Sequence, residues 1–271
     1  MADLIHPTAN IDPSARLGSG VRVGPGAVIG AEVEIGDDSE IGPSAQVFGP
    51  TRLGRENHVY PLACVGFDPQ DLKFKGERSE LVVGDRNVIR ELATLNRGTA
   101  FGGGVTRIGD DNLFMAYSHV GHDSQVGSRT VFTNGATLAG HVEVDDDATI
   151  GAMSAVHQFC RVGRHAYIGG FSVITLDALP FARTVGQKPL CYGVNRIGLE
   201  RKGLDADAIR EIERAFRVLL RSGKNTSQAL DELRALPQRS AHVDYLIEFV
   251  AASKRGVIKS KRAGARGAGA D

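Results

Sequence analysis

The sequence predicts an all-β solenoid, a parallel β-helix of hexapeptide repeats, that ends in an α-helical C-terminus. An apolar residue returns every sixth position through most of the 271-residue chain. The first run comprises Ile5, Ile11, Leu17, Val23, Ile29, Ile35, Ile41, Val47, Leu53, Val59 and Val65, continued by Val83, Ile89 and Leu95. A second run, shifted by one residue, comprises Ile108, Phe114, Val120, Val126, Phe132, Leu138, Val144, Ile150, Val156, Val162, Ile168 and Ile174. Neither the two-residue period of a strand nor the 3.6-residue period of a helix gives this pattern.

Each repeat is expected to form one short strand and one corner, so that three repeats make a triangular coil of eighteen residues. The apolar residue points into the prism. A small residue at the fifth place, such as Ala27, Ala45 or Ala136, fits the crowded corner. Coils stack about 4.8 Å apart, and no coil can bury its own core, so stability comes from the stacking of neighbours.

The β-helix is expected to occupy residues 1–185, with two inserted loops near residues 67–80 and 99–106 that break the six-residue period. The first loop contains Asp71 and Lys73, and the second contains three consecutive glycines. Loops that leave a regular solenoid are where function is expected.

A C-terminal helical domain is expected over residues 186–258, because apolar residues there recur at helical spacing. The spacing predicts three helices, at Asp205–Arg221, Ser227–Leu236 and His242–Lys254. We expect them to follow the last coil and to help cover its exposed strand edge. The tail over residues 259–271 is rich in Lys, Arg, Gly and Ala and is expected to be disordered.

The composition gives no sign of nucleic-acid or membrane binding. Lys and Arg together number 32, as do Asp and Glu, so no bulk charge favours nucleic acid or a membrane surface. No apolar run approaches the length of about 20 residues that a membrane-spanning helix needs, and no leader peptide opens the chain. The three cysteines, Cys64, Cys160 and Cys191, lack metal-site spacing and are expected to be buried free thiols in a reducing compartment.

Three histidines fall on one face of three consecutive coils. His122, His141 and His157 belong to repeats that begin at Val120, Leu138 and Val156, eighteen residues apart each time. We therefore expect their imidazoles to line one groove over roughly 10 Å, given the spacing of stacked strands.

Three interpretations of this histidine row compete. They could be ordinary surface histidines, although three aligned beside an inserted loop make this the weakest interpretation. They could bind zinc, as in β-helical carbonic anhydrases, but the second close histidine that would follow His157 in that family is missing. General-base catalysis by one histidine, with the others positioning substrate, is the interpretation we favour.

Several motifs resemble the UDP-N-acetylglucosamine O-acyltransferase family, which performs the first step of lipid A synthesis. The resemblance covers residues 4–255 and is most specific at the histidine motifs and the Gln-Asp-Leu-Lys loop. The matching segments are residues 70–73, 96–99, 102–104, 119–123, 134–142, 155–159 and 192–195. It implies a left-handed β-helix and a cytoplasmic homotrimer with active sites between subunits. It also implies transfer of an (R)-3-hydroxyacyl chain from acyl carrier protein to the sugar 3-hydroxyl of UDP-N-acetylglucosamine. No cofactor, no metal, no nucleic acid and no stable membrane insertion are expected.

The resemblance also implies roles for individual residues. His122 matches the general base, Asp123 the carboxylate that supports its imidazolium, and the N–H of Gly140 the oxyanion donor. Gly170 matches the position that limits acyl length. The substrate-binding set that the resemblance implies comprises Asp71, Lys73, His119, His141, His157, Gln158, Asn195 and Arg201. Within this set Arg201 is directed at the phosphates and Asn195 at the nucleotide.

Three residues depart from the family pattern. Asn96 stands where the family often has histidine, Ile197 where a glutamate can occur, and Lys202 where a second arginine is found. Lysine keeps the charge but cannot make a bidentate contact with phosphate. A diaminosugar nucleotide as acceptor, the later N-acyl transfer of the same pathway, and a metal-binding repeat protein therefore stay open as alternatives. The N-acyltransferase would carry an additional domain before its repeats, which here begin at Ile5.

Overall fold

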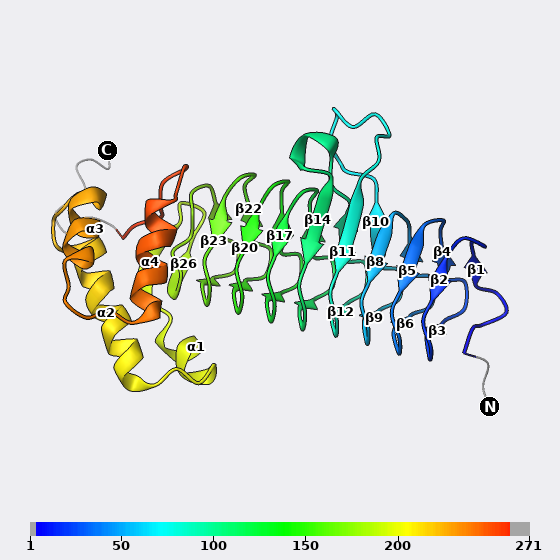
Figure 1. Ribbon diagram of the computed structural model, residues 1–271, viewed down its shortest axis with the longest axis horizontal. Coiled ribbons are helices and arrows are strands. Elements are labelled where there is room, and N and C mark those ends of the chain that lie inside the picture. Colours follow the sequence, from blue (N-terminus) through cyan, green and yellow to red (C-terminus); the bar gives the residue numbers. More distant parts are fainter. Residues whose placement is uncertain (1–3, 261–271) are drawn as a thin grey trace, which may run out of the picture.

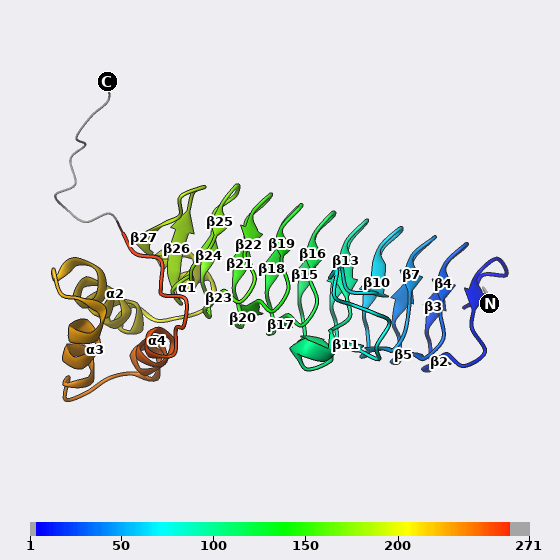
Figure 2. The same cartoon turned by 90° about the horizontal axis from the view of Figure 1, so that it is seen from above.

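The computed structural model describes residues 4–260 and shows a long three-sided prism with helices at its C-terminal end (Figure 1). Three sheets run the length of the prism (Figure 2). The first contains β1 (Asn10–Ile11), β4 (Val28–Ile29), β7 (Gln46–Val47), β10 (Cys64–Phe67), β13 (Thr94–Asn96), β16 (His119–Val120), β19 (Thr137–Leu138), β22 (Ala155–Val156) and β25 (Val173–Ile174). The second contains β2 (Arg16–Leu17), β5 (Val33–Ile35), β8 (Thr51–Leu53), β11 (Glu80–Val83), β14 (Val105–Ile108), β17 (Gln125–Val126), β20 (Glu143–Val144) and β23 (Arg161–Val162). The third contains β3 (Arg22–Val23), β6 (Glu40–Ile41), β9 (His58–Val59), β12 (Val88–Ile89), β15 (Leu113–Phe114), β18 (Val131–Phe132), β21 (Thr149–Ile150), β24 (Tyr167–Ile168), β26 (Ala182–Val185) and β27 (Leu190–Val194).

The register confirms the eighteen-residue coil. Val120 pairs with Leu138, and Leu138 with Val156, in parallel strands of the first sheet. The repeating apolar residues fill the interior, where Phe114 and Phe132 stack with ring centroids 4.9 Å apart. The small fifth-place residues Ala27, Ala45 and Ala136 are fully buried, as predicted, whereas Ala9 and Ala15 at the N-terminal end are partly buried. The left-handed sense of the coil stays a prediction.

The repeating apolar residues are incompletely buried at the N-terminal end. Ile5 is 43% exposed, and Ile11 and Leu17 are only partly buried. These three residues form the first coil, which stacks on a neighbour on one side only among the described residues, and a solenoid coil is buried only when another coil stacks on it.

The corners place residues with positive φ one above another, in three columns along the prism. Between the first and second sheets the column contains Asp123, His141 and Phe159. Between the second and third sheets it contains Asp111, Arg129, Asp147 and His165. Between the third and first sheets it contains Leu62, Leu92, Tyr117, Met153 and Phe171. The second column is therefore mostly charged and the third is made of large apolar side chains, whereas the first brings a carboxylate, an imidazole and an aromatic ring together.

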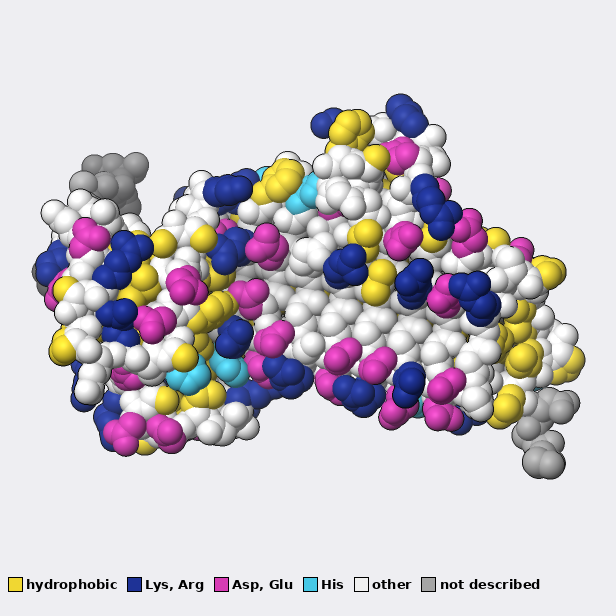
Figure 3. All heavy atoms as spheres, viewed as in Figure 1, with side chains coloured by type: hydrophobic (Ala, Val, Ile, Leu, Met, Phe, Trp, Pro, Cys, Tyr) yellow, Lys and Arg dark blue, Asp and Glu magenta, His cyan; other side chains and the backbone are white. Residues whose placement is uncertain are grey.

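Both insertions leave the prism on the same side (Figure 1). The first connects β10 to β11, and the second contains the short 3-10 helix η1 (Ala100–Gly102) before β14. Leu72 of the first insertion and Phe101 of the second line one surface hollow, and their exposed fractions are 98% and 82%. Figure 3 shows hydrophobic side chains gathered on this projection, next to basic ones.

Four helices follow the prism: α1 (Arg196–Arg201), α2 (Ala206–Arg221), α3 (Thr226–Arg234) and α4 (Ala241–Ala251). No prediction was made for α1. It has only six residues, too few for a periodic pattern. Helix α4 is hydrogen-bonded to the prism. The hydroxyl of its Tyr245 donates to Asp145 and accepts from the backbone N–H of Arg164, and both of these residues belong to the last coils.

The exposed edge of the third sheet is covered first by a strand, and a helix packs on that strand. The last coil ends in β26, and β27 pairs with β26 in antiparallel fashion to form the final strand of that sheet. Helix α2 then lies against β27. Within residues 4–260, no helix combines the length and the apolar character needed to cross a membrane.

The three cysteines are free thiols. Cys160 and Cys191 are buried, whereas Cys64 is partly exposed. Most of the tail expected to be disordered lies outside the described residues. Its first residue, Lys259, accepts a hydrogen bond from the N–H of Cys191 through its carbonyl.

Candidate active site

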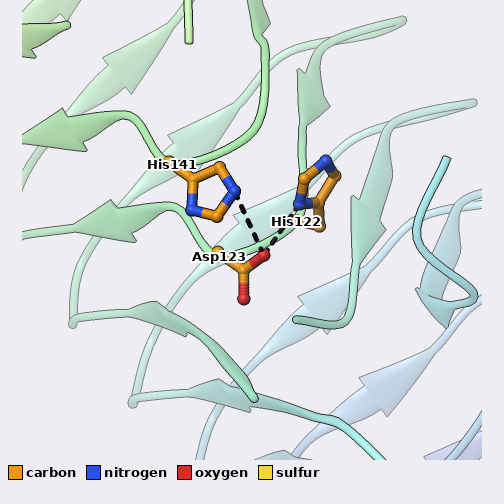
Figure 4. Close-up of side chains that lie close together, drawn as sticks. All are labelled: His122, Asp123 and His141. Atoms are coloured by element: carbon orange, nitrogen blue, oxygen red, sulfur yellow. Dashed lines mark hydrogen bonds and ion pairs between the residues drawn. The ribbon is translucent and has the colours of Figure 1, made fainter. Parts of the chain in front are cut away.

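Two of the three aligned histidines meet at one carboxylate, at the corner between the first and second sheets. Nδ1 of His122 lies 2.8 Å from Oδ2 of Asp123, and Nε2 of His141 lies 3.7 Å from the same oxygen. The two imidazoles approach edge to face with centroids 5.1 Å apart. Figure 4 shows both rings directed at this oxygen from neighbouring coils.

The Asp123 side chain is completely buried, and each of its oxygens is hydrogen-bonded. Oδ1 accepts from the backbone N–H of Thr99 at 2.8 Å, and Oδ2 accepts from the Thr99 hydroxyl at 2.7 Å. Burial acts to raise the pKa of Asp123. The hydrogen bonds from His122 and from both donors of Thr99 outweigh burial, so that this pKa lies below its ordinary value of 3.8. The site therefore holds an ionised carboxylate at neutral pH.

The carboxylate fixes the proton on His122. An ionised carboxylate can only accept, so the hydrogen of the Nδ1–Oδ2 bond belongs to Nδ1. Nε2 then carries a free lone pair and can act as a base. The His122 side chain is 14% exposed, so this nitrogen lies in a largely dehydrated site.

Gly140 lies directly against the His122 ring. A Cβ atom at position 140 would lie 2.4 Å from Cε1 and 2.5 Å from Nε2 of His122, so that only glycine fits. Gly140 and His122 come from adjacent coils, because β16 and β19 are neighbours in the first sheet. Among the described residues, the Gly140 N–H donates to no protein acceptor.

His141 is held between the carboxylate and an aromatic ring. Its imidazole stacks on Phe159 with a centroid distance of 4.6 Å. Burial lowers the pKa of His141, and the negative charges of Asp123 and Asp71 act in the opposite direction. The first insertion thus brings Asp71 close enough to influence this imidazole.

His119 lies next to the pair, one strand position before the corner. Its Nδ1 forms a 2.7 Å hydrogen bond with the Thr94 hydroxyl. Burial lowers the pKa of His119, and the charge of nearby His122 lowers it further. His119 is therefore neutral at pH 7 and available for hydrogen bonding.

A metal ion is geometrically possible at this cluster. Ligand atoms of His122, Asp123 and His141 all lie within 4.8 Å of one another. A metal ion would have to replace the 2.8 Å hydrogen bond between His122 and Asp123, because both of its atoms would become ligands. The hydrogen bond between His122 and Asp123, together with the two Thr99 donors on the carboxylate, fits a histidine–aspartate pair better than a metal site.

His157 and Gln158 are exposed, and within the described residues neither is hydrogen-bonded to His122. Nδ1 of His157 instead shares a 3.1 Å hydrogen bond with the carbonyl of Gln158. The expected row of three imidazoles is thus a pair, because His157 holds a different place in its repeat and the residue in register with His141 is Phe159, which stacks on it. The backbone N–H of Lys73 donates to the Asp71 carboxylate, and the Lys73 side chain is exposed at the first insertion.

Three further predicted residues lie away from the pair within one chain. Gly170 lies at a different corner, two residues after the end of β24, and is exposed. Asn195 precedes α1, where its side-chain amide donates to the His165 carbonyl at 3.4 Å. Arg201 is the exposed last residue of α1. Within the described residues, no hydrogen bond or ion pair joins any of the three to the side chains of His122 or Asp123.

Sequence reasoning assigned no role to Thr99 or Phe159. Phe159 follows His141 by eighteen residues, a signal that could have been used. Thr99 follows the interrupted repeat, where the period gives no register. Asn96, one of the departures, is buried, and its amide donates to the carbonyl of Asp68 at the root of the first insertion.

Family models match two segments of the chain. Residues 177–258 match "Udp N-acetylglucosamine O-acyltransferase; Domain 2", and residues 14–49 match the bacterial transferase hexapeptide model. The acyl-[acyl-carrier-protein]–UDP-N-acetylglucosamine O-acyltransferase of Alkalilimnicola ehrlichii is 49% identical over 197 residues, which are 73% of this chain and 76% of that protein.

Solved structures agree over almost the full length. The UDP-N-acetylglucosamine acyltransferase of Francisella novicida superposes with a TM-score of 0.93 at 32% identity, covering 98% of this chain and all of that one. The enzyme of the same name from Bacteroides fragilis superposes with a TM-score of 0.90 at 39% identity, covering 93% of this chain and 99% of that one. The chain belongs to the UDP-N-acetylglucosamine O-acyltransferase family.

Proposed function

We propose that this protein transfers an acyl chain from acyl carrier protein to UDP-N-acetylglucosamine, the first step of lipid A biosynthesis, with His122 as general base. Family membership supports the reaction. The observation that carries the mechanism is the buried His122–Asp123 pair, which leaves Nε2 of His122 free beside Gly140.

The geometry supports the following sequence of events. Nε2 of His122 takes the proton of the sugar 3-hydroxyl as its oxygen attacks the thioester carbon. Asp123 stabilises the imidazolium that forms. The Gly140 N–H, which lacks a protein acceptor among the described residues, is placed to donate to the developing oxyanion. Collapse of the tetrahedral intermediate breaks the C–S bond, and the imidazolium returns its proton to the leaving thiolate.

The assembly in this proposal is a homotrimer with the active sites between subunits. One corner of the prism supports it, because large apolar side chains are exposed there in a column of five: Leu62, Leu92, Tyr117, Met153 and Phe171. Contiguous exposed apolar surface of this kind marks an interaction site. Gly170, Asn195 and Arg201 lie away from His122 within one chain, and a neighbouring subunit would supply them.

Substrate contacts complete the proposal. Asp71, His119, His141, His157 and Gln158 would bind the sugar. Lys73 and Arg201 would bind anionic groups, Arg201 the phosphates, and Asn195 the nucleotide. The donor would be an (R)-3-hydroxyacyl chain on acyl carrier protein, with Gly170 limiting its length. We also propose that the protein works in the cytoplasm, as the family resemblance implies.

One assay tests the acceptor. Purified protein is incubated with hydroxyacyl carrier protein and with either UDP-N-acetylglucosamine or its 3-amino analogue, and products are identified by mass spectrometry. The proposal requires an ester of UDP-N-acetylglucosamine to form faster than the amide. Preferential amide formation would assign the chain to a diaminosugar nucleotide, and no product with either acceptor would contradict acyl transfer.

A second experiment tests the assembly. Sedimentation is expected to give a trimer, and a mixture of His122→Ala and Arg201→Ala proteins, reassembled after mild dissociation, is expected to regain part of the activity. A fully active monomer would contradict a site formed between subunits.

A further inference from the structure

The second insertion encloses the Asp123 carboxylate. Its first residue, Thr99, donates both its N–H and its hydroxyl to Asp123, and its last residue, Thr106, accepts a 2.8 Å hydrogen bond from the Asp123 N–H. Both threonines are buried, with exposed fractions of 1% and 0%. The insertion is therefore fastened to the residue that supports His122.

Part of this arrangement is an ordinary feature of the fold. Elsewhere in the prism, Asp37, Asp85 and Asp110 each accept one backbone N–H from the preceding coil, at 2.8 Å. The bond from the Thr99 N–H to Oδ1 of Asp123 is the same kind of contact. The Thr99 hydroxyl is what differs, because it donates to Oδ2, the oxygen that also accepts from His122.

The direction of the Thr99 hydroxyl is set by a neighbour. The backbone N–H of Gly102 donates to the Thr99 oxygen at 3.1 Å, so the hydroxyl hydrogen is left to point at Asp123. Hydrogen bonds in such a chain polarise one another. A Cβ atom at Gly102 would lie 2.0 Å from Cγ of Asp123, so glycine is required for this close approach.

We propose that Thr99 is a positioning residue of the reaction: its hydroxyl fixes the rotation of the Asp123 carboxylate and thereby holds His122 with its proton on Nδ1. The proposal rests on the proposed role of His122 as base. Without the hydroxyl, the amide of Thr99 still anchors Oδ1, but Oδ2 loses one of its two hydrogen-bonded partners and the carboxylate can turn away from the imidazole.

The test compares Thr99→Val, which removes the hydroxyl at nearly constant shape, with Thr99→Ser, which keeps it. Thr130→Val is the matched control. The N–H and hydroxyl of Thr130 also donate to one buried side-chain oxygen of a neighbouring coil, Oδ1 of Asn112, at 2.8 and 2.6 Å. Thr130 lies at the corner between the second and third sheets, away from His122.

For Thr99→Val we expect kcat to fall about tenfold to a hundredfold, the loss typical of a slightly misplaced catalytic group, with KM for UDP-N-acetylglucosamine unchanged. Thr99→Ser is expected to restore kcat, and Thr130→Val to keep it. If Thr99→Val does not fold, Thr99→Cys, with its weak S–H donor, is expected to give an intermediate kcat. A kcat of Thr99→Val within twofold of wild type, or an equal loss in Thr130→Val, would overturn the proposal.

A second readout does not depend on turnover. Nitrogen-15 NMR of histidine-labelled protein is expected to show His122 protonated on Nδ1 in the wild type and a mixture of tautomers in Thr99→Val. Identical tautomer populations in both proteins would refute the role of Thr99. If the tautomer shifts but the wild type transfers no acyl group, the proposed function fails while the positioning contact stands.

Discussion

Replacing Asp123 by asparagine tests the histidine–aspartate pair with almost no change of shape. The amide oxygen can still accept the Thr99 N–H, which lies 2.8 Å from Oδ1. The amide nitrogen then replaces Oδ2, where it faces Nδ1 of His122. Because an amide N–H donates, His122 can bond to it only by accepting through Nδ1, and its proton moves to Nε2. The nitrogen that should take the substrate proton is then no longer a base.

Substitutions of Asp123 are expected to affect catalysis and stability to different extents. Loss of a general base costs about 10²–10⁴ in rate, and we expect kcat of Asp123→Asn to fall by this factor. Asp123→Ala would instead leave both donors of the buried Thr99 without acceptors, at about 1–3 kcal/mol each, or about 2–6 kcal/mol in total. Asp123→Asn keeps one acceptor for Thr99 and is expected to lose less stability than Asp123→Ala.

The assay combines steady-state acyl transfer with urea unfolding of both variants. The expected pattern is a large loss of kcat in Asp123→Asn with little change in its unfolding midpoint, and a clearly lowered midpoint in Asp123→Ala. If Asp123→Asn keeps more than a tenth of wild-type kcat, the carboxylate does not set the tautomer of His122, and Asp123 is only a corner-capping residue.

Three further outcomes are expected. Gly140→Ala should lower kcat at least tenfold, because its methyl group would overlap the His122 ring; full activity in a crystal-verified variant would contradict the packing. Burial lowers the pKa of His119 below 6.5 in the folded protein, so the unfolded chain binds more protons than the folded protein as the pH falls through this value. The free energy of unfolding should therefore fall as the pH drops from 7.5 to 5.5, and it should fall less steeply in His119→Gln. Equal slopes in melts of the two proteins would show that His119 is not responsible. Gly170→Met should shorten the preferred acyl donor in kcat/KM measurements, since each buried methylene contributes roughly 0.8 kcal/mol; an unchanged preference would place the length limit elsewhere.

The fold followed from the sequence because each repeat buries an apolar residue at the same place, two positions after a residue that is small in many repeats. The apolar residue recurs at a fixed interval, so the register of Val120, Leu138 and Val156 could be counted. The period says nothing about the ends. Ile5 matches the pattern, but no coil stacks on its outer side within residues 4–260, and β27 closes the third sheet by an antiparallel pairing that no hexad encodes.

The site was predictable where its residues keep the period. His122 and Asp123 are adjacent in sequence, and His141 lies one coil further, so their meeting followed from counting. Thr99 could not be placed in this way, because the insertion that carries it breaks the register. His157 does not keep the eighteen-residue register, because it holds the second place of its repeat and His141 the fourth; the residue eighteen positions after His141 is Phe159, whose ring stacks on that imidazole.

The most direct test of the account is the turnover of His122→Ala, measured as formation of acylated UDP-N-acetylglucosamine by mass spectrometry with excess chelator present. We predict that the wild type stays active under these conditions. The variant should lose at least the roughly 10²–10⁴-fold typical of a general base, with the sedimentation and melting behaviour of the wild type. A variant that retains more than a tenth of the activity, or a wild type that needs added zinc, would contradict the assignment of His122 as the base.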